Sequence, residues 1–139
     1  MKRLAVLSVG LSLAFAACGG GSSPTSSPTP SVGSRPTSTG KIAIVSPTAG
    51  QTVSTKGVIV KVSLEGATLV QGPATTTLRP DEGHMHLLVD GSTITLTGSL
   101  EVPTGPLTAG THLIEVEFAA NDHGPFNPRV IAQVTVRAG

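Results

Sequence analysis

Residues 83–90 read GHMHLLVD, a stretch in which the side chains alternate in character along the chain. Successive residues of a β-strand point to opposite faces, so Met85, Leu87 and Val89 share one apolar face. The other face carries four side chains, those of His84, His86, Leu88 and Asp90. The pattern predicts a strand over residues 84–90, in which Met85 fills the core rather than binding copper.

Period-two alternation broken at Gly and Pro recurs along the second part of the chain, and no stretch has helical periodicity. The predicted strands are residues 41–45, 58–64, 84–90, 93–97, 111–119 and 129–136, with a weak one near 75–78. Six or seven short strands in this length predict an all-β fold, an immunoglobulin-like antiparallel β-sandwich. A small barrel is the alternative.

Composition narrows the classes of function. The 139 residues include one Cys, no Trp and no Tyr, and nine basic side chains against eight acidic ones. A near-neutral chain without a basic cluster is not expected to bind nucleic acid. No Ser or Cys stands in the context of an activated nucleophile, and no aromatic platform for sugars is available. We therefore expect a protein that is not an enzyme.

The N-terminal residues 1–17 are typical of a signal peptide, with Lys2 and Arg3 before an apolar run of twelve residues. Residues 15–18, FAAC, resemble the bacterial lipobox, although Phe15 stands where Leu is usual. This resemblance implies that Cys18 is lipidated and becomes the mature N-terminus. Ordinary cleavage after Ala16 is the alternative. The expected location is the bacterial cell envelope, outside the cytoplasm, with a lipid anchor in the membrane.

Residues 18–40 contain the lipidated Cys18 and a stretch rich in Gly, Ser, Thr and Pro. A segment with so little apolar surface does not offset its conformational entropy, so we expect a disordered linker. The composition changes at Lys41, and residues 41–139 are the predicted folded domain.

The four histidines separate into two groups if strands 84–90 and 111–119 are antiparallel neighbours, as the third and sixth strands of an immunoglobulin-like sandwich are. His84 and His86 then lie near Ala119 and the following loop, which carries Asp122 and His123. His112 lies at the other end, where it is expected to pair with Asp90 in a structural role.

Three imidazoles at one end of the sandwich can form a site for Zn²⁺ or Cu²⁺ with one open position. The candidate ligands are His84, His86 and His123, with Asp122 as an auxiliary ligand. The alternative is that these imidazoles hydrogen-bond the loop backbone and one another. The acidic residues nearby are interpreted as solvated, Asp81 and Glu82 in a turn and Glu115 and Glu117 on an exposed face.

Three motifs occur in the order seen in the DUF4399 family of bacterial extracytoplasmic domains, and the sequence resembles that family. They are Gly-His-x-His-Leu-Leu-x-Asp at residues 83–90, Gly-x-His-x-Leu, which is matched here by Gly110, His112 and Leu113, and Asp-His-x-Pro at residues 122–125. The sequence departs at Met85, where a third histidine is frequent, and around Pro125. The resemblance implies an envelope protein with a sandwich-like domain and brings no established activity.

Two functions follow from these observations. The first is a non-catalytic binding or structural module that is tethered to the cell surface and contacts an unknown protein. The second is an envelope metal-binding protein that takes copper or zinc through the three-histidine site.

Overall fold

The computed structural model describes residues 34–139, so the predicted signal peptide, Cys18 and the first part of the linker lie outside the described residues. The described strands are β1 (Lys41–Ser46), β2 (Thr52–Val53), β3 (Ile59–Glu65), β4 (Thr68–Leu69), β5 (Glu82–Val89), β6 (Ser92–Thr97), β7 (Glu101–Pro103), β8 (Gly110–Ala120) and β9 (Pro125–Ala138). In this part of the chain no helix is long and apolar enough to cross a bilayer.

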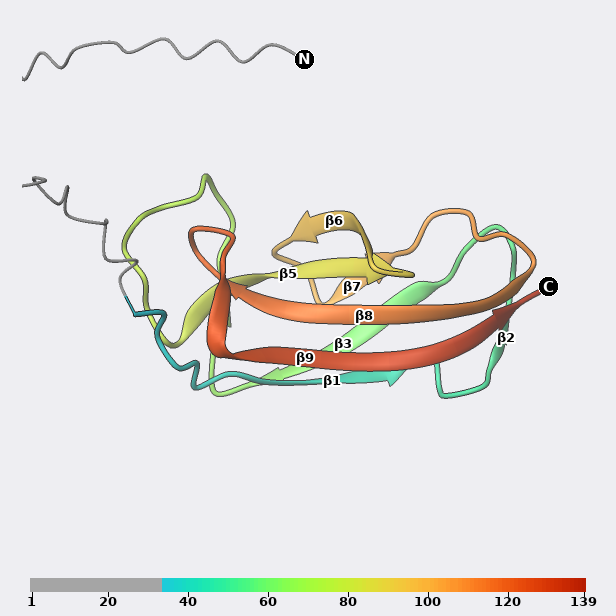
Figure 1. Ribbon diagram of the computed structural model, residues 1–139, viewed down its shortest axis with the longest axis horizontal. Coiled ribbons are helices and arrows are strands. Elements are labelled where there is room, and N and C mark those ends of the chain that lie inside the picture. Colours follow the sequence, from blue (N-terminus) through green and yellow to red (C-terminus); the bar gives the residue numbers. More distant parts are fainter. Residues whose placement is uncertain (1–33) are drawn as a thin grey trace, which may run out of the picture. The chain divides into compact units, whose positions relative to one another are not determined.

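The strands form two sheets that face each other (Figure 1). One sheet has the order β1-β3-β7, and the other has the order β2-β9-β8-β5-β4 with β6 also paired to β5. The main pairings are antiparallel, while the two-residue strands β2 and β4 pair in parallel with β9 and β5. The predicted all-β, immunoglobulin-like sandwich is confirmed.

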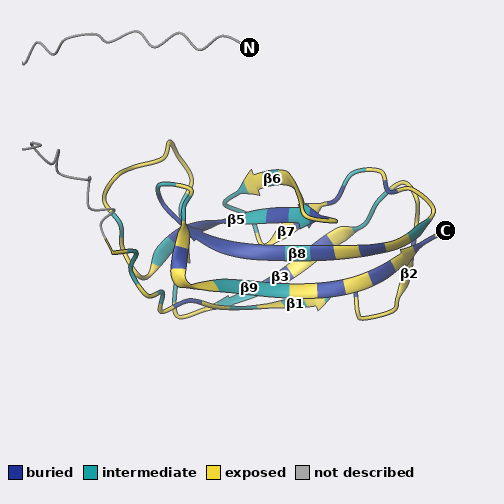
Figure 2. Cartoon of the chain, viewed as in Figure 1, coloured by how far each residue is buried: buried dark blue, intermediate teal, exposed yellow. Residues whose placement is uncertain are grey.

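The core lies between the sheets and is supplied by alternate residues of each strand (Figure 2). Met85, Leu87 and Val89 of β5 are buried as predicted, and so are the inward residues of β8. The rings of Phe118 and Phe126 stack with centroids 5.3 Å apart. Each large apolar side chain buried here contributes roughly 1.5–3 kcal/mol to stability.

The pairing of β5 with β8 positions the histidines, and its register runs from Gly83 opposite Ala120 to Val89 opposite Ile114. At Gly83 the strands approach so closely that a Cβ would lie 2.1 Å from the carbonyl oxygen of Ala119 and 2.9 Å from the ring of Phe118. Glycine at the head of the His-x-His motif is therefore required by packing.

The hairpin between β5 and β6 turns at Asp90 and Gly91, both with positive φ, 52° and 79°. Two such residues are typical of a type I′ turn, and Asp-Gly is a preferred pair for it. The Asp90 side chain forms hydrogen bonds with β8, the strand that pairs with the other edge of β5. Its Oδ1 accepts a bond from the backbone N–H of Leu113 at 2.9 Å, and its Oδ2 accepts one from His112 Nδ1 at 2.7 Å. The predicted pairing of His112 with Asp90 is confirmed.

Several strand boundaries differ from the prediction. Residues 75–78 form no strand, because this exposed loop makes only local bonds and one from the N–H of Thr75 to the carbonyl of Asn121. Strand β9 begins at Pro125, not at Arg129. The short strands β2, β4 and β7 were not predicted, since two or three residues are too few to display an alternation.

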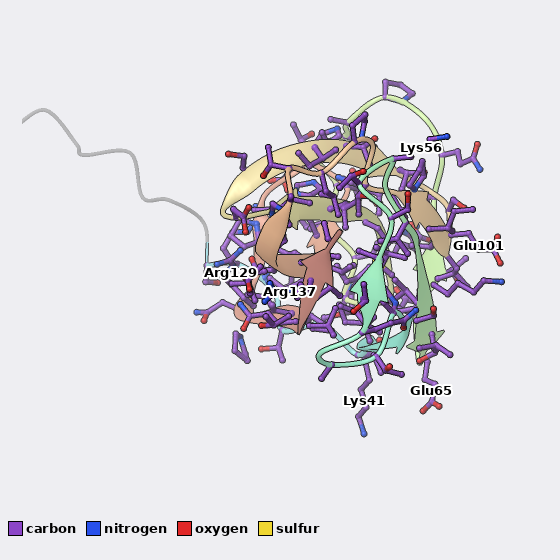
Figure 3. All side chains as sticks on the ribbon, turned by 90° about the vertical axis from the view of Figure 1, so that its right-hand side faces the viewer. Lys41, Lys56, Glu65, Glu101, Arg129 and Arg137 are labelled. Carbon is purple, nitrogen blue, oxygen red and sulfur yellow. The ribbon has the colours of Figure 1, made fainter. Side chains whose placement is uncertain are left out.

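Residues 34–40 were assigned to the linker but contact the domain. The N–H of Thr39 donates to the carbonyl of Pro80, and the N–H of Asn127 donates to the carbonyl of Pro36, both at 3.0 Å. Residues that pack against the domain are therefore found before Lys41. Lys41 and Glu65, partners across β1 and β3, both project away from the domain (Figure 3).

Candidate metal centre

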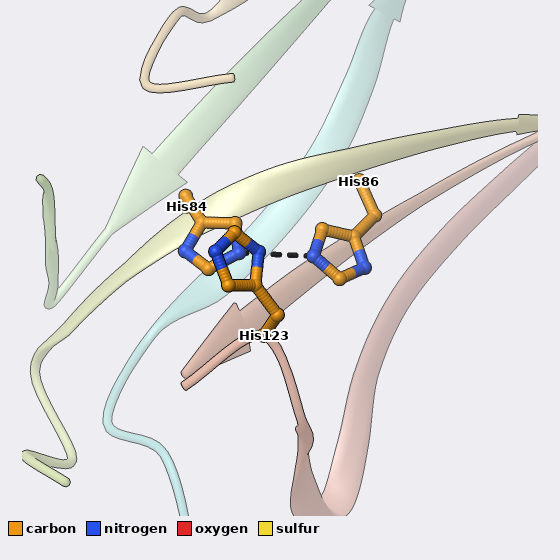
Figure 4. A group of neighbouring side chains, drawn as sticks. All are labelled: His84, His86 and His123. Carbon is orange, nitrogen blue, oxygen red and sulfur yellow. Dashed lines mark hydrogen bonds between the residues drawn. The ribbon is translucent and has the colours of Figure 1, made fainter. Parts of the chain in front are cut away.

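Three histidine side chains meet at one end of the larger sheet, which confirms the predicted proximity (Figure 4). His84 and His86 project from β5, and His123 lies in the turn between β8 and β9. One ring nitrogen of each residue lies within 4.8 Å of the others. Nε2 of His84 and Nε2 of His86 are 2.9 Å apart, so one ring donates a hydrogen bond and the other accepts it.

The order of β5 and β8 explains why the third imidazole arrives here. Strand β8 ends opposite the start of β5. Two backbone hydrogen bonds close the turn that follows β8: the N–H of His123 donates to the carbonyl of Ala120, and the N–H of Ala120 donates to the carbonyl of Gly124. His123 has a φ of +64°, a left-handed conformation in which His is one of the few tolerated side chains. The His123 ring reaches His84 with a centroid distance of 4.2 Å.

The environment of His84 and His86 favours the neutral form of both imidazoles. Burial lowers the pKa of His84 to about 4, with a further contribution from the neighbouring His123 and His86. Burial also lowers the pKa of His86, while the negative charge of Glu117 acts in the opposite direction. A neutral imidazole offers the nitrogen lone pair that a metal ion requires.

Asp122 plays a different role from the auxiliary ligand that was predicted. Both of its carboxylate oxygens accept hydrogen bonds from the guanidinium of Arg35, with Nη2 2.8 Å from Oδ1. This ion pair lowers the pKa of Asp122 to about 2. Asp122 therefore anchors the turn to the segment before β1 and is not among the ligand atoms that gather within 4.8 Å.

Glu117 is buried, which corrects the interpretation of it as a solvated residue; Glu115 beside it is partly buried. Glu117 lies opposite His86 in the β5–β8 pairing. Its two carboxylate oxygens accept bonds from Nε and Nη2 of Arg129, each at 2.8 Å. The ion pair raises the pKa of Arg129, and the guanidinium compensates the negative charge of Glu117 close to His86.

A cavity of about 610 Å³ borders the histidines and is lined in part by His84 and His123. Its other walls come from the loop after β4, the end of β6, Glu82 and Asn121. Asn121 is buried, and among the described residues its Oδ1 has no hydrogen-bond partner. Glu82, which was expected to be solvated in a turn, is the first residue of β5 and is partly buried, and its Oε2 lies 3.6 Å from Nε of Arg79.

At the opposite end of β5, both ring nitrogens of His112 donate hydrogen bonds. Nδ1 donates to Asp90, and Nε2 donates to the carbonyl of Thr108 at 2.8 Å. These two bonds raise the pKa of His112, because they are made together only by the protonated ring. His112 thus joins the Asp90 turn to the carbonyl of Thr108 and stands apart from the three-histidine cluster.

Comparisons with known proteins identify the fold. No family model and no curated protein matches the chain, so the similarity to DUF4399 stays a prediction. Among solved structures, the fibronectin(III)-like modules of Clostridium thermocellum CbhA are similar at a TM-score of 0.50 and 13% identity, over 70% of this chain and 93% of that one. An engineered protein aligns at a TM-score of 0.45 and 17% identity, over 72% of this chain and 20% of that one.

Proposed function

We propose that this β-sandwich is a non-catalytic module that binds a divalent transition metal, Cu²⁺ or Zn²⁺, through His84, His86 and His123. The observation that carries the proposal is the gathering of three ring nitrogens within 4.8 Å, from a strand and a turn that are distant in sequence. Imidazole suits both ions, and three imidazoles leave one position for water or another ligand.

The distances are compatible with coordination after small ring movements. Two nitrogens bound to one tetrahedral Zn²⁺ at about 2.0–2.1 Å are roughly 3.3 Å apart. Nε2 of His84 and Nε2 of His86, now 2.9 Å apart, would separate slightly when a metal replaces their shared proton, while His123 would move closer. Rotations about side-chain bonds suffice for such shifts.

His84 and His123 both line the cavity, so a fourth ligand would reach the bound ion from that side. A hydrolytic metal enzyme would also need a general base beside the bound water. Glu82, the carboxylate in the cavity wall, is engaged by Arg79 and by the amide of Asn121, 3.4 Å from Nδ2 to Oε2. We therefore favour binding over catalysis.

A second candidate is a purely structural or protein-binding module in which the histidines stabilise one another. The 2.9 Å hydrogen bond between His84 and His86 favours this alternative, since it gives one nitrogen of each ring a partner without an ion. In either case we propose a surface-tethered bacterial lipoprotein acylated at Cys18. Intact-mass analysis of the membrane fraction tests this, and a mature chain that starts at Ala17 without lipid would refute it.

Calorimetric titration of the purified protein with Zn²⁺ and Cu²⁺ separates the two candidates. We expect one ion per chain at micromolar affinity or better, and a loss of at least about 100-fold in the double variant His84→Ala/His86→Ala. His112→Gln is the matched control, since it also removes a histidine and should leave the affinity unchanged. No binding, or binding that the double variant retains, would favour the structural module.

A further inference from the structure

The segment before β1 contacts the turn that carries His123. We call residues 35–39 the strap. Its Pro36 carbonyl accepts from the N–H of Asn127 at 3.0 Å, and its Thr37 hydroxyl donates to the carbonyl of Asn127 at 2.9 Å. At its other end, Thr39 bonds the carbonyl of Pro80. The strap thus lies against the first residues of β9, just after the turn that carries His123.

Arg35 makes the contacts nearest to the cluster, and they bracket His123 on both sides. Its guanidinium holds the carboxylate of Asp122, the residue before His123, through both terminal nitrogens. Its Nε donates to the carbonyl of Pro125, two residues after His123, at 2.6 Å. The side chain of Arg35 is 22% exposed, so the contact is largely shielded from water.

These contacts restrain a turn whose backbone conformation is unfavourable. His123 holds a left-handed backbone, which a residue with a side chain keeps only where its surroundings fix it. Within the turn, the carboxylate of Asp122 also accepts from the N–H of Gly124 at 3.0 Å. His84 and His86, by contrast, stand on β5, a strand that β8 and β6 hold from either side.

We propose that Arg35 is a positioning residue of the metal site: by clamping Asp122 and Pro125 it holds the His123 imidazole in reach of the other two. This inference rests on the proposed metal-binding function. Because the clamp and the metal both stabilise the same conformation of the turn, strap docking and metal binding are thermodynamically linked. The last residues of the predicted linker, 35–39, are then part of the site.

Cu²⁺ titrations of the purified protein test the proposal. Arg35→Gln is expected to weaken Cu²⁺ binding about 10-fold, as removal of partners that orient a ligand typically does. Gly124→Ala should act similarly, because its Cβ would lie 2.6 Å from Nη2 of Arg35 and displace the guanidinium. Lys61→Gln is the matched control, since it breaks an exposed ion pair with Glu101 on the other sheet.

A combination with His123→Ala distinguishes positioning from general destabilisation. Arg35→Gln should add no further loss of affinity once His123 is gone, and the electron paramagnetic resonance spectrum of bound Cu²⁺ should change toward that of His123→Ala. Arg35→Lys should recover part of the affinity. Unchanged or tighter Cu²⁺ binding in Arg35→Gln would overturn the proposal; tighter binding would mean that the released Asp122 acts as a ligand.

Hydrogen exchange provides a readout that needs no metal. In Arg35→Gln the N–H groups of His123 and Asn127 should exchange about 10-fold faster, while those in the middle of β5 stay protected. Unchanged exchange at His123 would refute the positioning role. If the unaltered protein binds no Cu²⁺, the proposed function fails, and this measurement still decides whether Arg35 holds the turn.

Discussion

The ion pair between Glu117 and Arg129 yields a stability prediction whose size depends on burial. Glu117 is 6% exposed, whereas the Arg129 side chain is 50% exposed. Breaking a fully buried pair costs about 3–5 kcal/mol, and an exposed pair contributes about 0–1 kcal/mol. With one partner buried and the other half in water, Arg129→Met should lower the free energy of unfolding by about 2 kcal/mol. For a domain of this size that is roughly 10 °C in melting temperature.

Urea unfolding followed by circular dichroism measures this loss. The double variant Glu117→Gln/Arg129→Met should lose less stability than the sum of the two single variants, because it also removes the buried charge of Glu117. Lys61→Met is the control: its pair with Glu101 is exposed on both sides, so the change should stay within about 0.5 kcal/mol. A decrease of less than about 0.5 kcal/mol in the free energy of unfolding of Arg129→Met would refute this reasoning. It would support the interpretation of Glu117 as a solvated residue.

Two further predictions concern the ends of β5. The pKa of His112 is raised, so its contribution to stability is complete below about pH 6.5 and is lost as the pH rises through the folded-state pKa. An NMR titration should give a midpoint above 6.5, and a lower midpoint would contradict the two donated bonds. Gly83→Ala should cost about 3 kcal/mol, since the new Cβ meets the backbone of Ala119; a variant within 1 kcal/mol of the parent in urea unfolding would contradict the close approach.

The sequence was sufficient to predict the parts of the site that depend on strand parity. Alternation in GHMHLLVD assigned Met85 to the core and the two histidines to the other face. Antiparallel pairing of that strand with residues 111–119 then separated His112 from His123. Both steps use only the two-residue period of a strand and its usual neighbours in a sandwich.

The residues that support the site could not be predicted, because their partners are distant in sequence. Arg35 lies among Ser, Thr and Pro residues that are typical of a linker, and only the fold shows that it reaches Asp122. The burial of Glu117 depends on Arg129 from the neighbouring strand. Alternation gives the face on which a side chain lies, but it does not show what covers that face.

X-ray absorption spectroscopy of the Zn²⁺-loaded protein tests the central claim most directly, because scattering from imidazole rings counts the histidine ligands. We predict three imidazole nitrogens at about 2.0–2.1 Å in the parent protein and two in His123→Ala. One imidazole or none in the parent, or the same count after His123 is removed, would contradict a site built by β5 and the β8–β9 turn.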